Sequence, residues 1–312
     1  QHLPLPVDDV GAIADLKKWG ATSGDVRAHH IAESEEGRLI LICIFGNSPY
    51  LANCVTHESS CLIDCLFDGV DTVFNRLLDA LPKLVLGNTH TLDFEVFSAE
   101  LRGARRRASL AIALAEIFGI WSTCQSAEAQ SRFADQVVTT TVDGLLLMAA
   151  NSGDICLSDM SVPSQGSGLI VLGLGKLGGY ELNYSSDIDL IILYEPAHLR
   201  LRDNLEEGSF FSRLAGRLVE ILETRTANGY VFRTDLRLRP DPGSTPLAVS
   251  TTAAETYYES LGQNWERAAL IKARPVAGDF AAANNFLEVI EPFIWRKSLD
   301  FAAIEDIHSI KR

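Results

Sequence analysis

The stretch that decides this fold is residues 168–196, GLIVLGLGKLGGYELNYSSDIDLIILYEP. An apolar run, a glycine-rich segment and a second apolar run predict a strand, a tight connection and another strand. The second run is apolar on both faces, which is typical of a central strand buried on two sides. Asp187 and Asp189 stand at its start, one residue apart. In an extended strand both carboxylates therefore leave the same face.

Two carboxylates at the start of a buried strand need a compensating cation. Removing two neighbouring anions from water is strongly unfavourable, because burial and like-charge repulsion both oppose ionisation. Carboxylate oxygens are the donors that hard divalent cations prefer. Asp187 and Asp189 therefore predict a divalent metal site, with Mg²⁺ or Mn²⁺ as the ion.

The glycines before these acids resemble a dinucleotide fingerprint, with Gly173-x-Gly175-x-x-Gly178 after an apolar strand. A Rossmann unit would continue into a helix of about ten or more residues, whereas Asp187 follows Gly179 by eight positions. This spacing argues against a dehydrogenase. Glycines also let backbone N–H groups approach phosphate oxygens, and a lysine adds a point charge. The predicted phosphate- or nucleotide-binding residues here are Gly175, Lys176, Gly178, Gly179 and Ser186.

A third carboxylate follows in residues 230–240, YVFRTDLRLRP, which predict a strand closed by Pro240. Alternation would place Arg233, Asp235, Arg237 and Arg239 on one face. Asp235 would complete a two-metal site, while Arg237 and Arg239 would bind phosphate oxygens with their forked guanidinium groups. The alternative is a solvated edge with alternating charges.

Further basic and acidic candidates lie near the end of the helix predicted over residues 251–272. Lys272 and Arg274 are candidates for phosphate binding, although cations at a helix end also interact favourably with the helix dipole. We expect Glu266 to pair with a neighbouring base, and Glu181 is a minor candidate ligand. The basic run Arg102, Arg105, Arg106 and Arg107 predicts a solvated helix face, with contact to an acidic partner as the alternative.

Composition limits the classes of partner. The net charge of −14 argues against broad nucleic-acid binding, which requires Lys and Arg to neutralise phosphates. No apolar run reaches the roughly 18 residues needed to span a bilayer. The six cysteines form no CxxC pair, which favours reduced thiols in a cytoplasmic protein. His57, Cys61 and Cys65 have helical spacing, but a single helix cannot wrap a metal, so we interpret them as core residues.

The sequence divides into three predicted regions. Residues 1–160 predict a helical region, with Ser48-Pro49, Asp71 and Asp93 as helix starts. Residues 161–280 predict the catalytic domain, after a Ser/Gly/Asp-rich boundary at 151–168, and include an amphipathic helix at 209–226. Residues 281–312 predict the start of a C-terminal helical region, and we expect the chain to be part of a longer protein. The predicted class is α+β, a helical bundle followed by a small mixed sheet and C-terminal helices.

Four segments together resemble one family, the bacterial bifunctional glutamine synthetase adenylyltransferase/adenylyl-removing enzymes. They are GLGKLGGYELNYSSDIDLI, DLRLRP, YYESLGQNWERAALIKARPVAGD and, in the helical region, FGNSPYL. One departure from many relatives is Thr245, which stands where they have glycine before the Pro-Leu pair. The resemblance implies two nucleotidyltransferase domains of the DNA polymerase beta type in one long chain. One removes AMP from a tyrosine of glutamine synthetase by phosphorolysis, and the other attaches it.

The flanking segments resemble the amino-terminal, adenylyl-removing half. The resemblance therefore implies a deadenylylating enzyme that regulates nitrogen metabolism, with Asp187, Asp189 and Asp235 holding two Mg²⁺ or Mn²⁺ ions. It further implies glutamine synthetase as protein substrate, phosphate and ADP or ATP as ligands, and the PII signal protein as a partner. The alternatives are the forward adenylyltransferase, which uses ATP, and a nucleotide-binding regulatory module without turnover.

Overall fold

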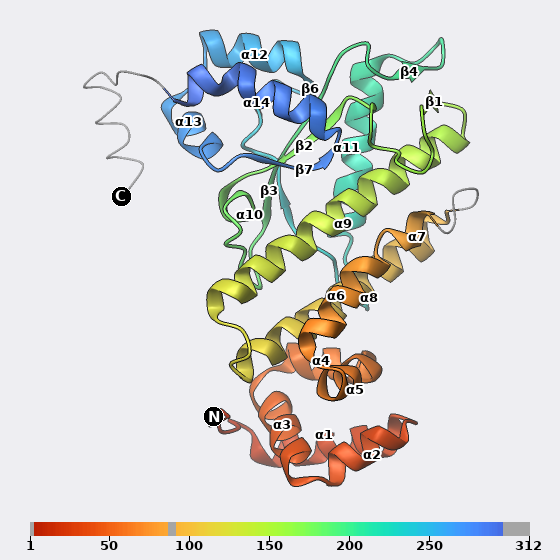
Figure 1. Ribbon diagram of the computed structural model, residues 1–312, viewed down its shortest axis with the longest axis vertical. Helices are drawn as coiled ribbons and strands as arrows, with labels where there is room; N and C mark the ends of the chain where they lie inside the picture. The colour runs from red at the N-terminus through yellow and green to blue at the C-terminus, as the bar shows by residue number, and fades with distance from the viewer. Residues whose placement is uncertain (1–2, 87–91, 296–312) are drawn as a thin grey trace.

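The computed structural model describes residues 3–86 and 92–295 and joins a helical region to a region built on a small sheet. In Figure 1 the first helices form the lower end, and the sheet with its covering helices forms the upper end. The predicted class, α+β, is confirmed. Of the predicted C-terminal region, residues 281–295 fall within or just after helix α14, and residues 296–312 lie outside the described residues.

The first half is helical, as predicted. Its helices are α1 (Asp9–Thr22), α2 (Val26–Glu33), α3 (Glu35–Asn47), α4 (Pro49–His57), α5 (Ser59–Phe67), α6 (Val70–Ala80), α7 (Lys83–Leu86), α8 (Phe94–Ile117) and α9 (Thr123–Asn151). The later helices are α10 (Gly175–Gly178), α11 (Glu207–Glu223), α12 (Thr251–Ser260), α13 (Asn264–Leu270) and α14 (Phe280–Ile294). The strands are β1 (Ile155–Cys156), β2 (Leu169–Gly173), β3 (Ile188–Tyr194), β4 (Arg200–Leu201), β5 (Thr234–Asp235), β6 (Ala248–Ser250) and β7 (Arg274–Gly278).

Helix starts follow the sequence signals in two of three cases. The Ser48 hydroxyl accepts from the Leu51 N–H with Pro49 at the first position of α4, and Asp93 caps α8 through the Val96 N–H. The expected cap at Asp71 is wrong. Asp71 lies inside the first turn of α6, and its carboxylate accepts from the Trp121 indole N–H at 2.9 Å instead.

The main sheet places β3 at its centre. The strand order is β5-β3-β2-β7, and β6 also pairs with β3. β2 runs antiparallel to β3 and β7, whereas β5 and β6 run parallel to β3. The prediction of a strand buried on both faces is confirmed, since Leu190 through Leu193 are at most 1% exposed. An antiparallel β2–β3 pair also excludes the Rossmann unit, whose strands are parallel.

Helix α9 connects the helical region to the sheet. It crosses the molecule diagonally in Figure 1 and packs against β7, where the Thr139 hydroxyl donates to the Val276 carbonyl at 2.9 Å. One apolar cluster contains α9 residues such as Phe133 and sheet residues such as Val171 and Ile188. The opposite face of the sheet is covered by α12 and α14 through a second cluster around Phe286. Segments on both sides of residue 160 therefore share one core.

Three segments of the second half differ from expectation. The predicted strand over residues 230–240 shortens to β5, because the Asp235 carboxylate accepts from the Arg237 N–H and turns the chain. The helix predicted over 251–272 is two helices, α12 and α13. β7 was missed because Pro275 and Gly278 weaken a strand pattern, and a proline is tolerated there since β7 pairs with β2 at the end of the sheet order.

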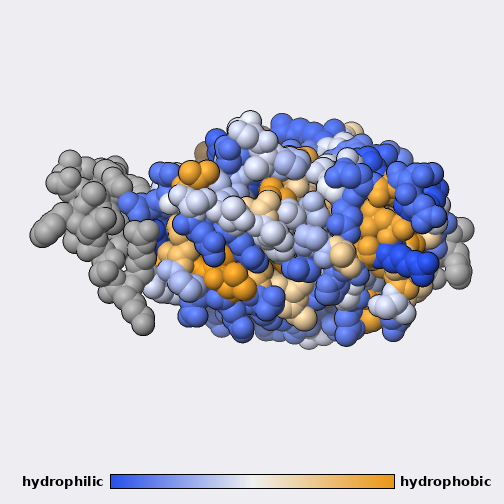
Figure 2. Space-filling model, turned by 90° about the horizontal axis from the view of Figure 1, so that it is seen from above, coloured by the Kyte–Doolittle hydropathy of each residue, from blue (hydrophilic) through white to orange (hydrophobic). Residues whose placement is uncertain are grey.

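The surface is mainly polar. Figure 2 views the molecule from the α12 and α14 end and shows hydrophilic residues over most of that face, with separate apolar patches. Among residues 3–86 and 92–295, none of the helices combines the length and apolar character needed to span a bilayer.

The packing of α11 on the sheet gives a stability prediction. Phe211 is fully buried and stacks on Tyr194 of β3 with ring centroids 4.6 Å apart. We expect Phe211→Ala to lower the free energy of unfolding by about 3–5 kcal/mol, because it removes a buried ring and leaves a cavity. Denaturant titration followed by circular dichroism measures the change. Val289→Ala on α14, where the side chain is 47% exposed, is the control and should cost under about 1 kcal/mol.

Candidate active site

The glycine-rich connection lies directly against one of the predicted metal ligands. It folds into the short helix α10 between β2 and β3. Gly175 has φ +53°, and a Cβ built on it would lie 2.3 Å from the Asp189 carboxylate oxygen Oδ2. Only glycine combines this left-handed conformation with so close an approach. The predicted loop and the predicted acids therefore meet in the structure.

The other loop residues pack against the segment before β7. A Cβ on Gly178 would lie 2.1 Å from the Lys272 carbonyl oxygen, and one on Gly179 would lie 3.1 Å from Lys272 Nζ. Lys176 is exposed, and its ammonium group donates to the Ser186 hydroxyl at 3.3 Å. Lys176 and Ser186 thus form the polar edge of the loop.

Parallel pairing of β3 and β5 brings the three predicted carboxylates together. Asp189 pairs in register with Asp235, and Asp187 lies two residues before Asp189 on the same face. The pKa of Asp189 is raised, first by burial and then by the charges of Asp235 and Asp187. Their mutual repulsion disfavours the ionised form of Asp189 and would be relieved by a nearby cation.

Arginines supply the positive charge in the present arrangement. Arg233, which sequence reasoning did not single out, donates to the Asp187 carboxylate, and Arg237 pairs with Asp235 at 2.6 Å. The hydrogen bond from Arg237 is the main cause of a lowered pKa at Asp235. Within the described part of the chain, no three His, Cys, Asp or Glu side chains are gathered tightly enough to hold a metal.

The donor chemistry nevertheless fits a divalent cation. All three groups are carboxylates, which Mg²⁺ and Mn²⁺ prefer. The Arg237 side chain is 85% exposed and that of Arg233 is 51% exposed. Exposed ion pairs contribute little stability, so exchanging each arginine for a metal ion costs little.

Arg239 serves the loop after β5. Its guanidinium donates to four backbone carbonyls, those of Leu236, Pro242, Thr245 and Pro246. These contacts use most of its five donors and give no support to the predicted phosphate contact. The Thr245 hydroxyl adds bonds to the Pro240 and Asp241 carbonyls at 2.6 and 2.8 Å. Thr245 therefore closes the same loop.

Arg274 and Lys272 hold the glycine loop from the other side. Arg274 begins β7 rather than ending a helix, donates to the Leu177 and Gly178 carbonyls and pairs with Asp135 of α9 at 2.9 Å. Its guanidinium also lies over the Tyr180 ring, 3.8 Å from the centroid. Lys272 pairs with Glu181 at 2.7 Å. No spacing in the sequence indicates Asp135, since its partner lies 139 positions away.

Two of the weaker sequence candidates have structural roles. Glu266 is 1% exposed and closes the start of α13, where it accepts from the Gln263 N–H and the Tyr257 hydroxyl. His57 ends α4, and Cys61 and Cys65 lie on the next helix, so these residues share no continuous helical face. Both cysteines are buried in a core cluster, as the structural interpretation predicted.

The predicted solvated face of the arginine run is wrong. Arg102 and Arg105 are only 5% and 7% exposed, and the next two arginines of α8 pair with the buried Glu58. The sheet region packs over this face of α8, which the helical spacing alone does not reveal. The run therefore lies between the two regions of the molecule.

Comparison with known proteins identifies related sequences. The sequence profile of the family described as Glutamate-ammonia ligase adenylyltransferase matches residues 39–289. A bifunctional glutamine synthetase adenylyltransferase/adenylyl-removing enzyme of Rhizobium meliloti (strain 1021) is 44% identical over 312 residues, covering 99% of this chain and 32% of that protein. The similarly described protein of Agrobacterium fabrum (strain C58) is 56% identical over 279 residues, covering 86% and 27%. The chain thus spans about a third of the length of these relatives.

The contact between the loop and Asp189 predicts the effect of Gly175→Ala. The added methyl group would strain the left-handed backbone by roughly 1–2 kcal/mol and push Asp189 out of register with Asp235. We expect lower thermal stability, measured by calorimetry. Gly243→Ala is the control, because its Cβ would meet only the Asp241 side chain at 3.8 Å. Equal behaviour of the two variants would contradict the predicted contact.

The raised pKa of Asp189 predicts that Asp189→Asn stabilises the metal-free protein. A raised folded-state pKa means that ionised Asp189 costs stability as pH rises above the ordinary carboxyl value of 3.8. The variant should therefore melt at a higher temperature than the wild type at pH 7, and the difference should vanish below pH 3.8. Added Mg²⁺ should raise the melting temperature of the wild type and leave that of the variant almost unchanged. A variant that melts below the wild type at pH 7 would contradict the expected repulsion.

Proposed function

The chain belongs to the Glutamate-ammonia ligase adenylyltransferase family, and we propose that it removes AMP from the adenylylated tyrosine of glutamine synthetase by phosphorolysis. The products would be ADP and the unmodified enzyme. The observation that carries the proposal is the in-register pairing of β3 and β5, which places Asp235 beside Asp189, next to Gly175 of the glycine loop and two residues from Asp187.

The bond changes define what the site must do. An oxygen of inorganic phosphate forms a bond to the phosphorus of the AMP group, the phosphorus–tyrosine oxygen bond breaks, and the phenolate takes up a proton. The charge on the attacking and transferred phosphates must be neutralised. Lys176 and Arg237 are exposed cations beside the acids, and Ser186 offers a hydroxyl at the loop edge. The Gly175 backbone N–H would complete the phosphate-binding surface, whereas the predicted contacts from Gly178 and Gly179 lose support because their N–H groups donate to the Leu174 and Gly175 carbonyls.

Asp187, Asp189 and Asp235 would hold Mg²⁺ or Mn²⁺, most simply two ions. Such ions supply charge neutralisation at the phosphates and stabilise the leaving phenolate. Arg233 and Arg237 would then leave the carboxylates and become available to phosphate oxygens, because a guanidinium binds phosphate as readily as carboxylate. Lys272 remains a weaker candidate, since its present partner is the exposed Glu181.

The direction of transfer rests on the segments around the acids. GYVFRTDLRLRP, GQNWERAALIKARP and RKSLDFAAIEDIHSIKR resemble the adenylyl-removing half of the family. The same acids could serve the forward adenylyltransferase, because that reaction also displaces a group from the phosphorus of AMP, with tyrosine attacking ATP and pyrophosphate leaving. An intact acidic triad argues against a regulatory module without turnover. Glutamine synthetase as substrate, PII as a partner and the cytoplasm as location belong to this proposal.

A product assay tests the proposal. The chain is incubated with adenylylated glutamine synthetase, Mg²⁺ and phosphate, and ADP is measured by chromatography. We expect ADP from the wild type and a loss of at least about 100-fold in rate for Asp187→Asn, because the metal loses one ligand. Asp203→Asn in the exposed turn before α11 is the matched control and should be fully active.

The opposite outcome is equally specific. AMP transfer from ATP to unmodified glutamine synthetase, without ADP formation from the adenylylated form, would assign the chain to the forward reaction. Circular dichroism of Asp187→Asn distinguishes lost chemistry from lost folding, since the exposed Asp187 contributes no core contact.

A further inference from the structure

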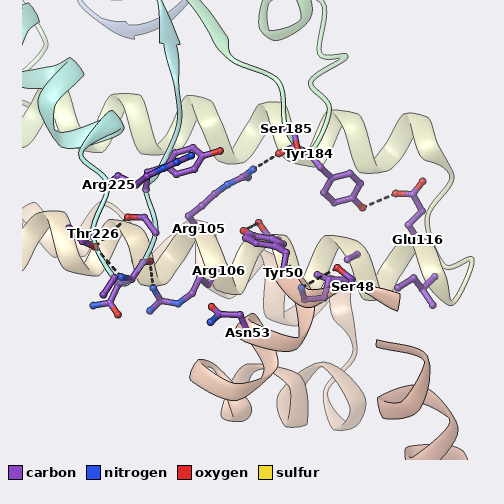
Figure 3. A pocket seen from close by; sticks show the side chains of 18 residues that line it. Ser48, Tyr50, Asn53, Arg105, Arg106, Glu116, Tyr184, Ser185, Arg225 and Thr226 are labelled. Carbon is purple, nitrogen blue, oxygen red and sulfur yellow. Dashed lines mark hydrogen bonds between the residues drawn. The ribbon is translucent and has the colours of Figure 1, made fainter. Parts of the chain in front are cut away.

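A cavity of about 900 Å³ lies between the helical region and the start of the catalytic strands. Its floor is formed by α4 and α8, and its roof by residues 184–185 and 225–230 (Figure 3). FGNSPYL contributes Ser48, Tyr50 and Leu51, and the arginine run contributes Arg105 and Arg106. Two sequence features without a role in the acidic site thus meet in one cavity.

Arg105 is a buried cation whose hydrogen-bond partners are neutral. Its guanidinium donates to the Gln130 side-chain oxygen at 2.7 Å and to the Tyr184 carbonyl at 2.9 Å, and it lies 4.6 Å from the centroid of the Phe232 ring. Among the described residues, no carboxylate forms an ion pair with it. Burial lowers its pKa, which shows that desolvation of the charge is incompletely compensated. An anionic ligand in the cavity would supply the missing charge.

The remaining charges of the cavity also favour an anion. Arg225 is exposed, lies over the Tyr230 ring at 5.2 Å and forms no ion pair with any described carboxylate. Arg106 pairs with Glu58 and donates to the Asn228 carbonyl. The acidic lining residue, Glu116, accepts from the Tyr184 hydroxyl at 2.7 Å. The cavity is therefore locally cationic in a chain whose net charge is −14.

Aromatic side chains give the cavity a second chemical character. Tyr50, Tyr184 and Tyr230 all line it. Tyr50 is 52% exposed, and its hydroxyl donates to Ser109 at 3.1 Å, which holds the ring at the wall. Tyrosine rings stack on planar heterocycles, and such stacking with a nucleobase contributes about 1–3 kcal/mol per base.

The cavity adjoins the acidic site through two short segments. Ser185 lines the cavity and is followed directly by Ser186 and Asp187. The two-residue span from Ser185 to Asp187 is at most roughly 7 Å long. Arg233 links the cavity lining to the acidic site, because it donates to the Ser185 carbonyl as well as to the Asp187 carboxylate. Tyr230 stands five residues before Asp235 on the other segment. The same two segments therefore line the cavity and carry the acids.

We propose that this cavity binds the nucleoside phosphate portion of the substrate, with the base against the tyrosine rings and the phosphate end toward Ser185 and Asp187. Arg105 and Arg225 attract the anion, and the volume suits a ligand of this size. That the bound group is the transferred AMP rests on the proposed function. That the cavity binds a nucleoside phosphate rests only on the residues that line it.

Direct binding tests the cavity with a matched control. Calorimetric titration of the chain with AMP should show roughly tenfold weaker binding for Arg225→Ala and for Tyr50→Ala, while Tyr50→Phe, which keeps the ring but loses the hydrogen bond to Ser109, should bind more tightly than Tyr50→Ala. Arg217→Ala is the control. Arg217 also lies over a ring, that of Phe94 at 5.1 Å, but outside this cavity. Unchanged affinity in both alanine variants would overturn the proposal.

Adenosine and inorganic phosphate separate the two halves of the ligand. Adenosine binding should weaken in Tyr50→Ala and stay unchanged in Arg225→Ala. Phosphate that competes for the whole AMP-binding signal, with no contribution from adenosine, would overturn the nucleoside assignment. In the ADP-forming assay, free AMP should raise the KM for adenylylated substrate, and AMP that lowered only kcat would overturn the assignment to substrate.

These measurements distinguish an incorrect assignment of the cavity from an incorrect assignment of the reaction. ADP formation with an unchanged KM in Arg225→Ala and Tyr50→Ala would overturn the cavity and leave the proposed reaction standing. AMP binding that weakens in both variants, in a chain that forms no ADP, would support the cavity and contradict the proposed reaction.

Discussion

The contact between Gly175 and the Asp189 carboxylate is the constraint on which the candidate site depends. β2 and β3 are antiparallel neighbours, so the chain must reverse within a short connection and return beside its own start. The left-handed Gly175 makes the reversal and leaves room for the carboxylate oxygen. A side chain there would separate loop from acid. The loop and Asp189 can therefore lie in contact only because this position has no side chain.

The sequence predicted the parts of this arrangement that depend on short-range pattern. The run from Ile188 to Leu193 is apolar at every position but one, which fixes a central strand, and the Asp187 and Asp189 spacing fixes their common face. The length of β5 could not be predicted, because alternation in the sequence continues past Asp235 while the Asp235 side chain turns the backbone. The local sequence pattern does not reveal whether a side chain will accept a hydrogen bond from a backbone N–H that a longer strand would otherwise use.

Arginine roles were the hardest to predict, for a physical reason. A guanidinium is equally suited to carboxylates, carbonyls and phosphates, so its function depends on what the fold places within reach. Arg239 and Arg274 have backbone carbonyls within reach and fix loops. Arg105 is covered when the residues before β3 and β5 pack over α8. Its spacing on a helix resembles a solvated face, since the covering segments lie far away in the sequence.

Uncompensated charge lies on both sides of residues 185–187, negative on one side and positive on the other. On one side ionised Asp189 is destabilised by burial and by its acidic neighbours. On the other side Arg105 is a buried cation with neutral partners. These charges do not neutralise one another, because Arg105 donates to the Tyr184 carbonyl while Arg233 holds Asp187. An anionic ligand that binds together with divalent cations would compensate both charges, since the cations would neutralise Asp189 and the anion would neutralise Arg105. A metal-bound nucleoside phosphate is the simplest ligand of that kind.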